Sequence, residues 1–129
     1  MSIIKADLFG PINPPDLCDF VIDSFGPSVF VPGEEPVLVM QAGDSEHPIM
    51  SSFNVILFTT KRLFFVHKKK KKYDDYPYNQ LVDYGIAKDG IISKRFILEF
   101  QRTLISLPKK DEIIETVVPV IKEYLNEHL

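Results

Sequence analysis

The sequence is poor in several residue types and patterns, and each shortage excludes a class of protein. Its single cysteine, Cys18, excludes an internal disulfide and a cluster of thiolate metal ligands, and it favours a reducing environment. No stretch approaches the roughly 20 apolar residues that a membrane helix needs. The opening segment MSIIKADLFGPINPP has neither the basic start nor the apolar block of a signal peptide. We therefore expect a cytoplasmic protein, peripheral to the membrane at most.

Signals of catalytic and metal chemistry are equally scarce. The histidines His47, His67 and His128 are scattered without a partner at metal-ligand spacing, and we expect them in exposed loop or terminal positions. Glycines occur singly, so no phosphate-binding loop is present, and no serine stands in a nucleophile elbow. Asp74 and Asp75 are neighbours, and on a strand they point to opposite faces. The sequence predicts a non-catalytic protein with no cofactor, no metal site and no small-molecule substrate.

Positive charge is concentrated in one place. The 129 residues are 45% hydrophobic and 26% charged, which is an ordinary composition for a single soluble domain. The net charge is −3, yet five of the fifteen basic residues form one run from Lys68 to Lys72. The run is therefore a basic patch on an acidic protein. Because the whole chain is acidic, its charge argues against nucleic acid as a partner, and RNA is the weakest of the candidates for this patch.

The pattern of apolar residues predicts a short N-terminal helix followed by strands. Residues 14–24 begin with two prolines, which suit the first helical positions, and Gly26 stops the helical spacing. From Glu35 the apolar period becomes two, and short spacers between strands require antiparallel hairpins. Pro77 indicates a strand edge or a bulge. Seven strands are predicted, in EPVLVMQAG, FNVILFTTK, RLFFVHKK, KYDDYPYNQL, LVDYGIAK, ISKRFILEFQ and RTLISLP.

The last segment, KKDEIIETVVPVIKEYLNEHL, returns to helical spacing. Asp111 and Glu112 lie in its first turn, where the helix dipole favours negative charge, and Pro119 predicts a bend. Since a strongly twisted antiparallel sheet of this size tends to curl, we predict a mostly β (α+β) fold: a small seven-stranded barrel or sandwich closed by this helix. The apolar face of the helix consists of Ile113, Ile114, Val117, Val118, Ile121, Tyr124 and Leu125.

The same patterns predict which side chains form the hydrophobic core. Alternate residues of the strands face one side of the sheet, and the apolar stripe of the C-terminal helix covers that side. We expect the following residues to be largely buried: Val37, Val39, Val55, Leu57, Leu63, Phe65, Phe96, Leu98, Phe100, Ile105, Val117 and Ile121.

Three short motifs in this order resemble the bacterial pleckstrin-homology-like (PH-like) domains. A GEE opening leads into the first strand, an FTNKRL-like hairpin joins the second and third, and an IPY-type segment leads into the fifth. Thr60 stands where asparagine is common, and Tyr76 replaces the usual aliphatic residue. The eukaryotic GRAM domains share the fold and part of the pattern. The matching residues are Gly33, Glu34, Glu35, Phe58, Thr59, Lys61, Arg62, Leu63, Pro77, Tyr78 and Leu81.

The resemblance covers residues 33–125, and it implies a PH-like domain over residues 33–129 that serves as a non-catalytic interaction or scaffolding module. Residues 1–32 lie outside it, as an N-terminal helix and connector of one globular unit. The apolar residues that precede the domain could pack on the chain's own barrel or on a neighbouring subunit. They are Phe25, Val29, Phe30 and Val31.

Two classes of partner follow from this reading. The first is a second copy of the chain or another protein, bound at a sheet edge or at the barrel rim. The second is an anionic lipid surface. Eukaryotic relatives bind lipid headgroups through basic residues between strands one and two, but here that loop, DSEHPIMSS, has no lysine or arginine. The candidate membrane contacts are therefore Lys68, Lys69, Lys70, Lys71 and Lys72, with help from Lys61 and Arg62.

The lysine run also has a simple structural interpretation, as the solvated end of a hairpin that discourages edge pairing. Each lysine contributes about 1 kcal/mol toward an anionic surface, so five give roughly 5 kcal/mol and an affinity near millimolar. Stable membrane binding would need several copies acting together. Arg62 is expected to be solvated or to pair with Asp74, Asp75 or Asp83.

Overall fold

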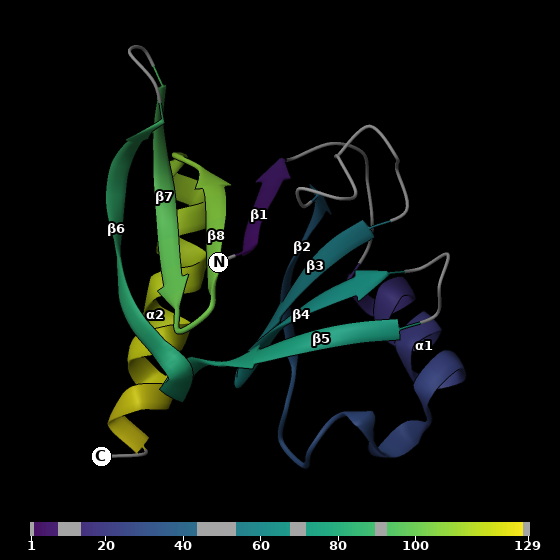
Figure 1. Ribbon diagram of the computed structural model, residues 1–129. Helices are drawn as coiled ribbons and strands as arrows, with labels where there is room; N and C mark the ends of the chain where they lie inside the picture. Colours follow the sequence, from purple (N-terminus) through teal and green to yellow (C-terminus); the bar gives the residue numbers. More distant parts are fainter. Residues whose placement is uncertain (1, 8–13, 44–53, 68–71, 90–92, 128–129) are drawn as a thin grey trace.

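The computed structural model describes residues 2–7, 14–43, 54–67, 72–89 and 93–127 (Figure 1). Two α-helices and eight strands are present in this part of the chain, with short 3-10 turns at Pro27–Val29 and Tyr78–Gln80. The elements are β1 (Ser2–Asp7), α1 (Pro14–Phe25), β2 (Pro36–Gly43), β3 (Asn54–Thr59), β4 (Arg62–His67), β5 (Lys72–Pro77), β6 (Leu81–Asp89), β7 (Ser93–Phe100), β8 (Thr103–Pro108) and α2 (Asp111–Glu127).

All eight described strands form one sheet in the order β5-β4-β3-β2-β1-β8-β7-β6. The expectation of seven antiparallel strands was wrong in two respects, because β1 is an eighth strand and it pairs in parallel with β8. The seven strands expected after residue 35 are all present, and their neighbouring hairpins are antiparallel. The fold is mostly β with a mixed sheet.

β1 lies in the middle of the sheet, between β2 and β8. Ile3 is opposite Leu104 in the parallel pair, and Ala6 is opposite Ala42 in the antiparallel pair. Ile4 and Ala6 are buried, while Ile3 and Lys5 face outward. The segment SIIKAD is too short for a clear alternation, and the partner β8 is almost at the other end of the chain, so no local signal predicted this pairing.

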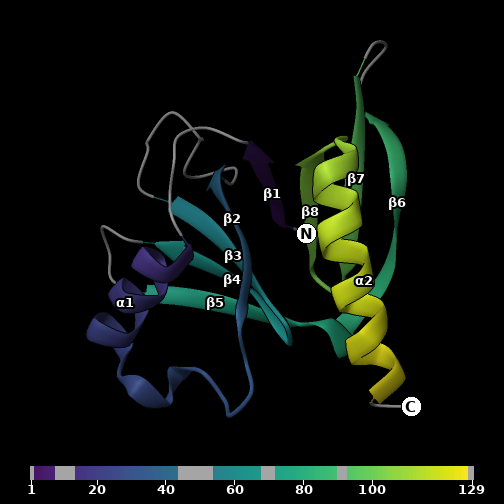
Figure 2. The ribbon, with the colours of Figure 1, turned by 180° about the vertical axis from the view of Figure 1, so that it is seen from behind.

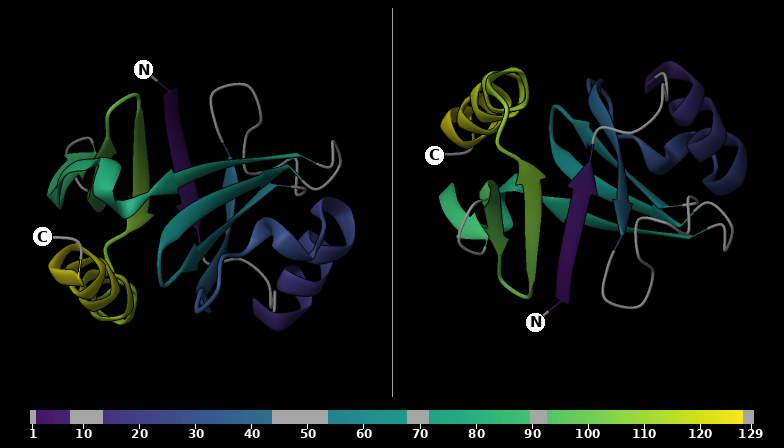
Figure 3. Two further views of the ribbon diagram at one scale, coloured as in Figure 1. Left: turned by 90° about the horizontal axis from the view of Figure 1, so that it is seen from below. Right: turned by 90° about the horizontal axis from the view of Figure 1, so that it is seen from above.

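The sheet curls but does not close. β5 and β6 are at opposite ends of the strand order, so the sheet is a half-barrel with two edges (Figures 1 and 3). α2 lies against the half formed by β6, β7 and β8, as Figure 2 shows from behind. The main core lies between this helix and the inner face of the sheet, with Phe58, Phe65, Phe100, Ile105 and Ile121 among its members.

A second, smaller core lies on the outer face. There α1 and the turn after it cover β3 and β4, so these two strands are buried on both faces. Val55 and Leu57 belong to this outer core, whereas Leu63 belongs to the inner one. The prediction of one common core was therefore wrong, and Val37 and Val39 are only half-buried. The other ten predicted core residues are buried.

The segment before residue 33 packs on the chain's own sheet. Val29 is buried, the Phe30 ring lies 5.5 Å from that of Phe64, and the Phe25 ring lies 4.8 Å from that of Tyr73. The predicted helix over residues 14–24 is confirmed, with one further residue at its C-terminal end. Gly26 follows with φ +97°, a conformation that suits glycine and ends the helix.

The predicted C-terminal helix is also confirmed. Ile113, Val117 and Ile121 are its buried residues, at the spacing of one helical face. Pro119 is exposed, and the helix continues through it without interruption.

The position of β1 predicts unequal effects of two neighbouring substitutions. Ile4→Ala removes a side chain that is 2% exposed and should lower the free energy of unfolding by about 2 to 5 kcal/mol. Ile3→Ala, at a side chain that is 53% exposed, should change it by about 0.5 kcal/mol or less. Urea unfolding of both variants measures the difference. Equal, small losses would show that β1 is not an integral strand.

Candidate functional site

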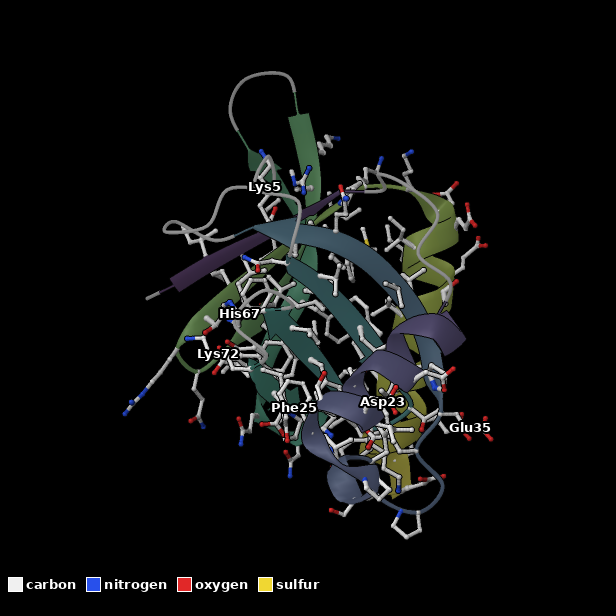
Figure 4. The ribbon with its side chains drawn as sticks, turned by 90° about the vertical axis from the view of Figure 1, so that its right-hand side faces the viewer. Lys5, Asp23, Phe25, Glu35, His67 and Lys72 are labelled. Atoms are coloured by element: carbon white, nitrogen blue, oxygen red, sulfur yellow. The ribbon has the colours of Figure 1, made fainter. Side chains whose placement is uncertain are left out.

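The structure separates the candidate membrane contacts into two groups. Lys72 is exposed at the start of β5, opposite His67 at the end of β4 (Figure 4). Lys68 to Lys71 lie outside the described residues, and in the sequence they connect these two antiparallel strands. Lys61 precedes β4 at its other end, and six residues of strand span about 20 Å. The structure therefore does not bring Lys61 together with Lys72.

Arg62 is held by partners within the chain. Its Nε and Nη2 donate to the two carboxylate oxygens of Glu34 at 3.0 and 3.1 Å, and its Nη1 donates to Asp75 Oδ2 at 3.0 Å. Nη2 also donates to the carbonyl oxygen of Val29. The guanidinium stacks over the Phe64 ring, 4.4 Å from its centroid. The predicted pairing with Asp75 is confirmed, while the pairing with Glu34 was missed.

Burial and charge act in opposite directions on Arg62. Burial lowers the pKa of its guanidinium, but the hydrogen bonds and charges of Glu34 and Asp75 outweigh burial and leave the pKa above its ordinary value. The Glu34 side chain is completely buried. The three side-chain nitrogens of Arg62 already donate to Glu34, Asp75 and Val29. Arg62 therefore serves as an internal anchor between the GEE segment and β4.

Thr59 of the β3–β4 hairpin and Tyr78 extend this anchor. The Thr59 hydroxyl donates to Glu34 Oε2 at 2.6 Å and accepts the N–H groups of Lys61 and Arg62. The buried Tyr78 hydroxyl donates to the Thr59 carbonyl oxygen at 2.6 Å. Burial raises the pKa of Tyr78, and the nearby Glu34 charge raises it further. Residues of all three sequence motifs thus meet in one hydrogen-bonded network. This network gives Glu34, Thr59 and Tyr78 a structural role.

His67 differs from its prediction. It was expected to be exposed, but it is 5% exposed, because it faces inward beside the Phe65 ring at 4.5 Å. Its Nε2 lies 3.5 Å from Asp74 Oδ2, whereas Asp75 binds Arg62 on the other face. The prediction that the two aspartates point to opposite faces is confirmed.

Within the described ranges, no group of three or more histidine, cysteine, aspartate or glutamate side chains could hold a metal ion. The helices in the same part of the chain include none that is long and apolar enough to span a membrane.

Arg95 is a buried polar residue that sequence reasoning missed. Its Nε donates to Ser106 Oγ at 2.7 Å, and its Nη2 donates to the carbonyl oxygens of Ala6 and Ser106 at 2.8 and 3.1 Å. It therefore connects β7 to both β8 and β1. The only signal was an arginine inside the apolar strand ISKRFILEF, which is equally typical of a solvated position.

Two shallow depressions of about 200 Å³ are present on the described surface. One lies between the β3–β4 turn and the last turns of α2, and Lys61, Glu123 and Glu127 are among its lining residues. The other runs along β6 and is the more apolar. It is lined by Asp83, Tyr84, Gly85, Ile86, Ala87, Ile97 and Glu99.

The anchor predicts a large difference between two adjacent glutamates. Glu34→Gln leaves Arg62 without its buried charged partner and should lower the free energy of unfolding by about 1.5 to 3 kcal/mol. Glu35→Gln, at an exposed side chain, should change it by about 0.5 kcal/mol or less. Thermal or urea unfolding measures both. Similar losses for the two variants would contradict the anchor.

Comparison with known proteins supports the same fold. The chain is similar to a DUF1696 family protein with a pleckstrin-homology domain from Shewanella loihica PV-4, at 17% identity and TM-score 0.55, over 94% of this chain and 96% of that one. Residues 33–129 alone could not give this coverage, so the shared fold extends into the N-terminal segment. A pleckstrin homology domain from Shewanella amazonensis SB2B matches at 15% identity and TM-score 0.49, over 90% of each chain.

No curated protein matches the chain. The model of one family, described as the bacterial PH domain, matches residues 32–124, which is well over half of the sequence. This match agrees with the half-barrel sheet, the C-terminal helix and the converging motifs. The chain belongs to the bacterial PH domain family.

Proposed function

We propose that this chain is a non-catalytic interaction module that binds a protein partner, either a second copy or another protein, by strand addition at β6. A PH-like fold supports the coarse assignment as an interaction module. The observation that carries the proposal is the difference between the two edges of the open sheet. One edge carries charged residues along its length, and the other has none in its middle.

The β5 edge is protected against pairing. Lys72, Asp74 and Asp75 are exposed along it, and Pro77 ends the strand. Asp75 is also tied to Arg62. Charged side chains and proline are the devices by which edge strands avoid adding another strand.

The β6 edge lacks this protection in its middle. β6 is nine residues long, and the stretch from Tyr84 to Ala87 contains neither charge nor proline. Ile86 is 48% exposed, Val82 is 63% exposed, and Gly85 has open space where a side chain would be. An exposed, apolar edge with unpaired backbone groups is the surface to which an extended segment adds as a further strand.

Strand addition predicts the effect of a charge on this edge. A neutral decapeptide of alternating threonine and valine should bind weakly and perturb β6 amides in an NMR titration. Ile86→Lys should weaken this binding about fivefold, because it removes one apolar cross-strand pair. Val31→Lys, at another exposed aliphatic residue (44% exposed) outside the sheet, should leave the binding unchanged.

Light scattering of the protein alone tests the second copy as partner. Self-pairing at β6 predicts a mass above that of the monomer. Ile86→Lys should lower this mass, and Val31→Lys should leave it unchanged. The proposal fails if peptide and protein at millimolar concentration leave the β6 amides unperturbed, or if both variants behave alike.

A second candidate function is weak binding to an anionic membrane. The observation that favours it is Lys72, which is exposed at the end of the β4–β5 hairpin where the sequence places the other lysines of the run. Because Lys61 lies at the opposite end of β4 and Arg62 is held internally, only the run from Lys68 to Lys72 remains for this role. Binding by five lysines alone would be generic and easily screened by salt.

Membrane binding predicts a result for two lysine variants. Replacement of all five residues from Lys68 to Lys72 by serine should abolish co-sedimentation with vesicles that contain phosphatidylserine. Lys61→Ser should not reduce it. Binding that survives 0.5 M salt, or that Lys61→Ser abolishes, would contradict the generic mechanism.

A further inference from the structure

We infer that the strand bound at β6 carries basic side chains on the outer face of the sheet, alternating with apolar ones, and belongs to another protein. This inference rests on the proposed strand addition at β6 and concerns the chemistry of the partner. It is drawn from the residues that line the depression along β6, which we call the β6 groove.

On the outer face of the sheet, the groove has an apolar floor and an acidic end. Register places Gly85 opposite Ile97 and Asp83 opposite Glu99. Gly85 leaves the floor open beside the half-buried Ile97, so the aliphatic stem of a lysine or arginine of an added strand can lie there. One step further along, Asp83 and Glu99 present two carboxylates side by side.

These two carboxylates are the only charged groups that line the groove in the described structure. Asp83 Oδ1 accepts the N–H of Tyr84 at 2.8 Å, which leaves its other oxygen for a partner. Ala87 and Arg95 lie at the other end of this face, and Arg95 already donates to Ser106 and the Ala6 carbonyl. An added strand therefore meets negative charge at one end of the groove, and no described cation of this chain lines the groove beside it.

A second copy of the chain fits this charge poorly. If two β6 strands paired antiparallel about Gly85, Asp83 of each would lie opposite Ala87 of the other, since opposed residues are equidistant from the centre. The described outer-face side chains of β6 are those of Asp83, Gly85 and Ala87, so self-pairing in this register places none of the described cations of β6 opposite the carboxylates. A lysine or arginine on a different protein does, because opposite charges across a strand pair are stabilising.

The test compares three synthetic decapeptides in which valine alternates with lysine, glutamine or glutamate. Each is titrated into the full chain at low salt, and the amide signals of β6 are followed by NMR. The valine–lysine peptide should bind about tenfold more tightly than the valine–glutamate peptide, with the glutamine peptide between them. Added salt should reduce this preference, because the charges are exposed.

A pair of double variants separates the local carboxylates from the overall charge of the chain. Asp83→Asn with Glu99→Gln should reduce the preference to about twofold or less, while the amide oxygen introduced at position 83 can still accept the Tyr84 N–H. Asp23→Asn with Glu115→Gln changes two exposed acids elsewhere by the same net charge and should preserve the preference.

Each other outcome overturns the inference in a distinguishable way. If the three peptides bind equally at β6, or if the Asp83→Asn, Glu99→Gln variant keeps the preference for the valine–lysine peptide, the inferred basic partner is wrong. Strand addition at β6 is then still supported. A dimer of the protein alone that Ile86→Lys dissociates shows that a second copy fills the edge. Absence of any peptide effect on β6 at millimolar concentration removes the proposed function as well.

Discussion

The sheet depends on a single strand, β1, which holds its two halves together. β2 to β5 form one antiparallel half and β6 to β8 the other, and among the described strands the two halves are paired only through β1. Arg95 strengthens the junction by reaching from β7 to the Ala6 carbonyl. The inner core extends across both halves, and Ile4 and Ala6 of β1 belong to it together with residues of α2.

This junction also separates two surfaces of different character. On the β2–β5 half, α1 covers the outer face, and charged residues protect the free edge. On the β6–β8 half, α2 covers the inner face, and in the described structure the depression along β6 on the outer side is exposed. We therefore place the proposed interaction on the second half, whereas the contacts between Arg62 and Glu34 stabilise the first.

The sequence predicted the features that local patterns encode. The hairpins, the helix from residue 14 and the C-terminal helix follow from apolar periodicity and from turn residues, and the opposite orientations of Asp74 and Asp75 follow from strand geometry. β1 could not be predicted, because its pairing joins distant segments. The inward position of His67 and the anchoring of Arg62 by Glu34 also depend on register between segments, which no single stretch of the chain specifies.

The parallel pairing of β1 with β8 has a consequence for how the protein forms. During synthesis β1 emerges before the other described strands, and its partner β8 is the last of them to leave the ribosome. Until then one side of β1 has no neighbour, so its unpaired backbone groups are open to other chains. A contact between segments so far apart in sequence also raises the contact order, which slows folding. We therefore expect folding to be completed only after translation of β8, with closure of the β1–β8 pair as a late step.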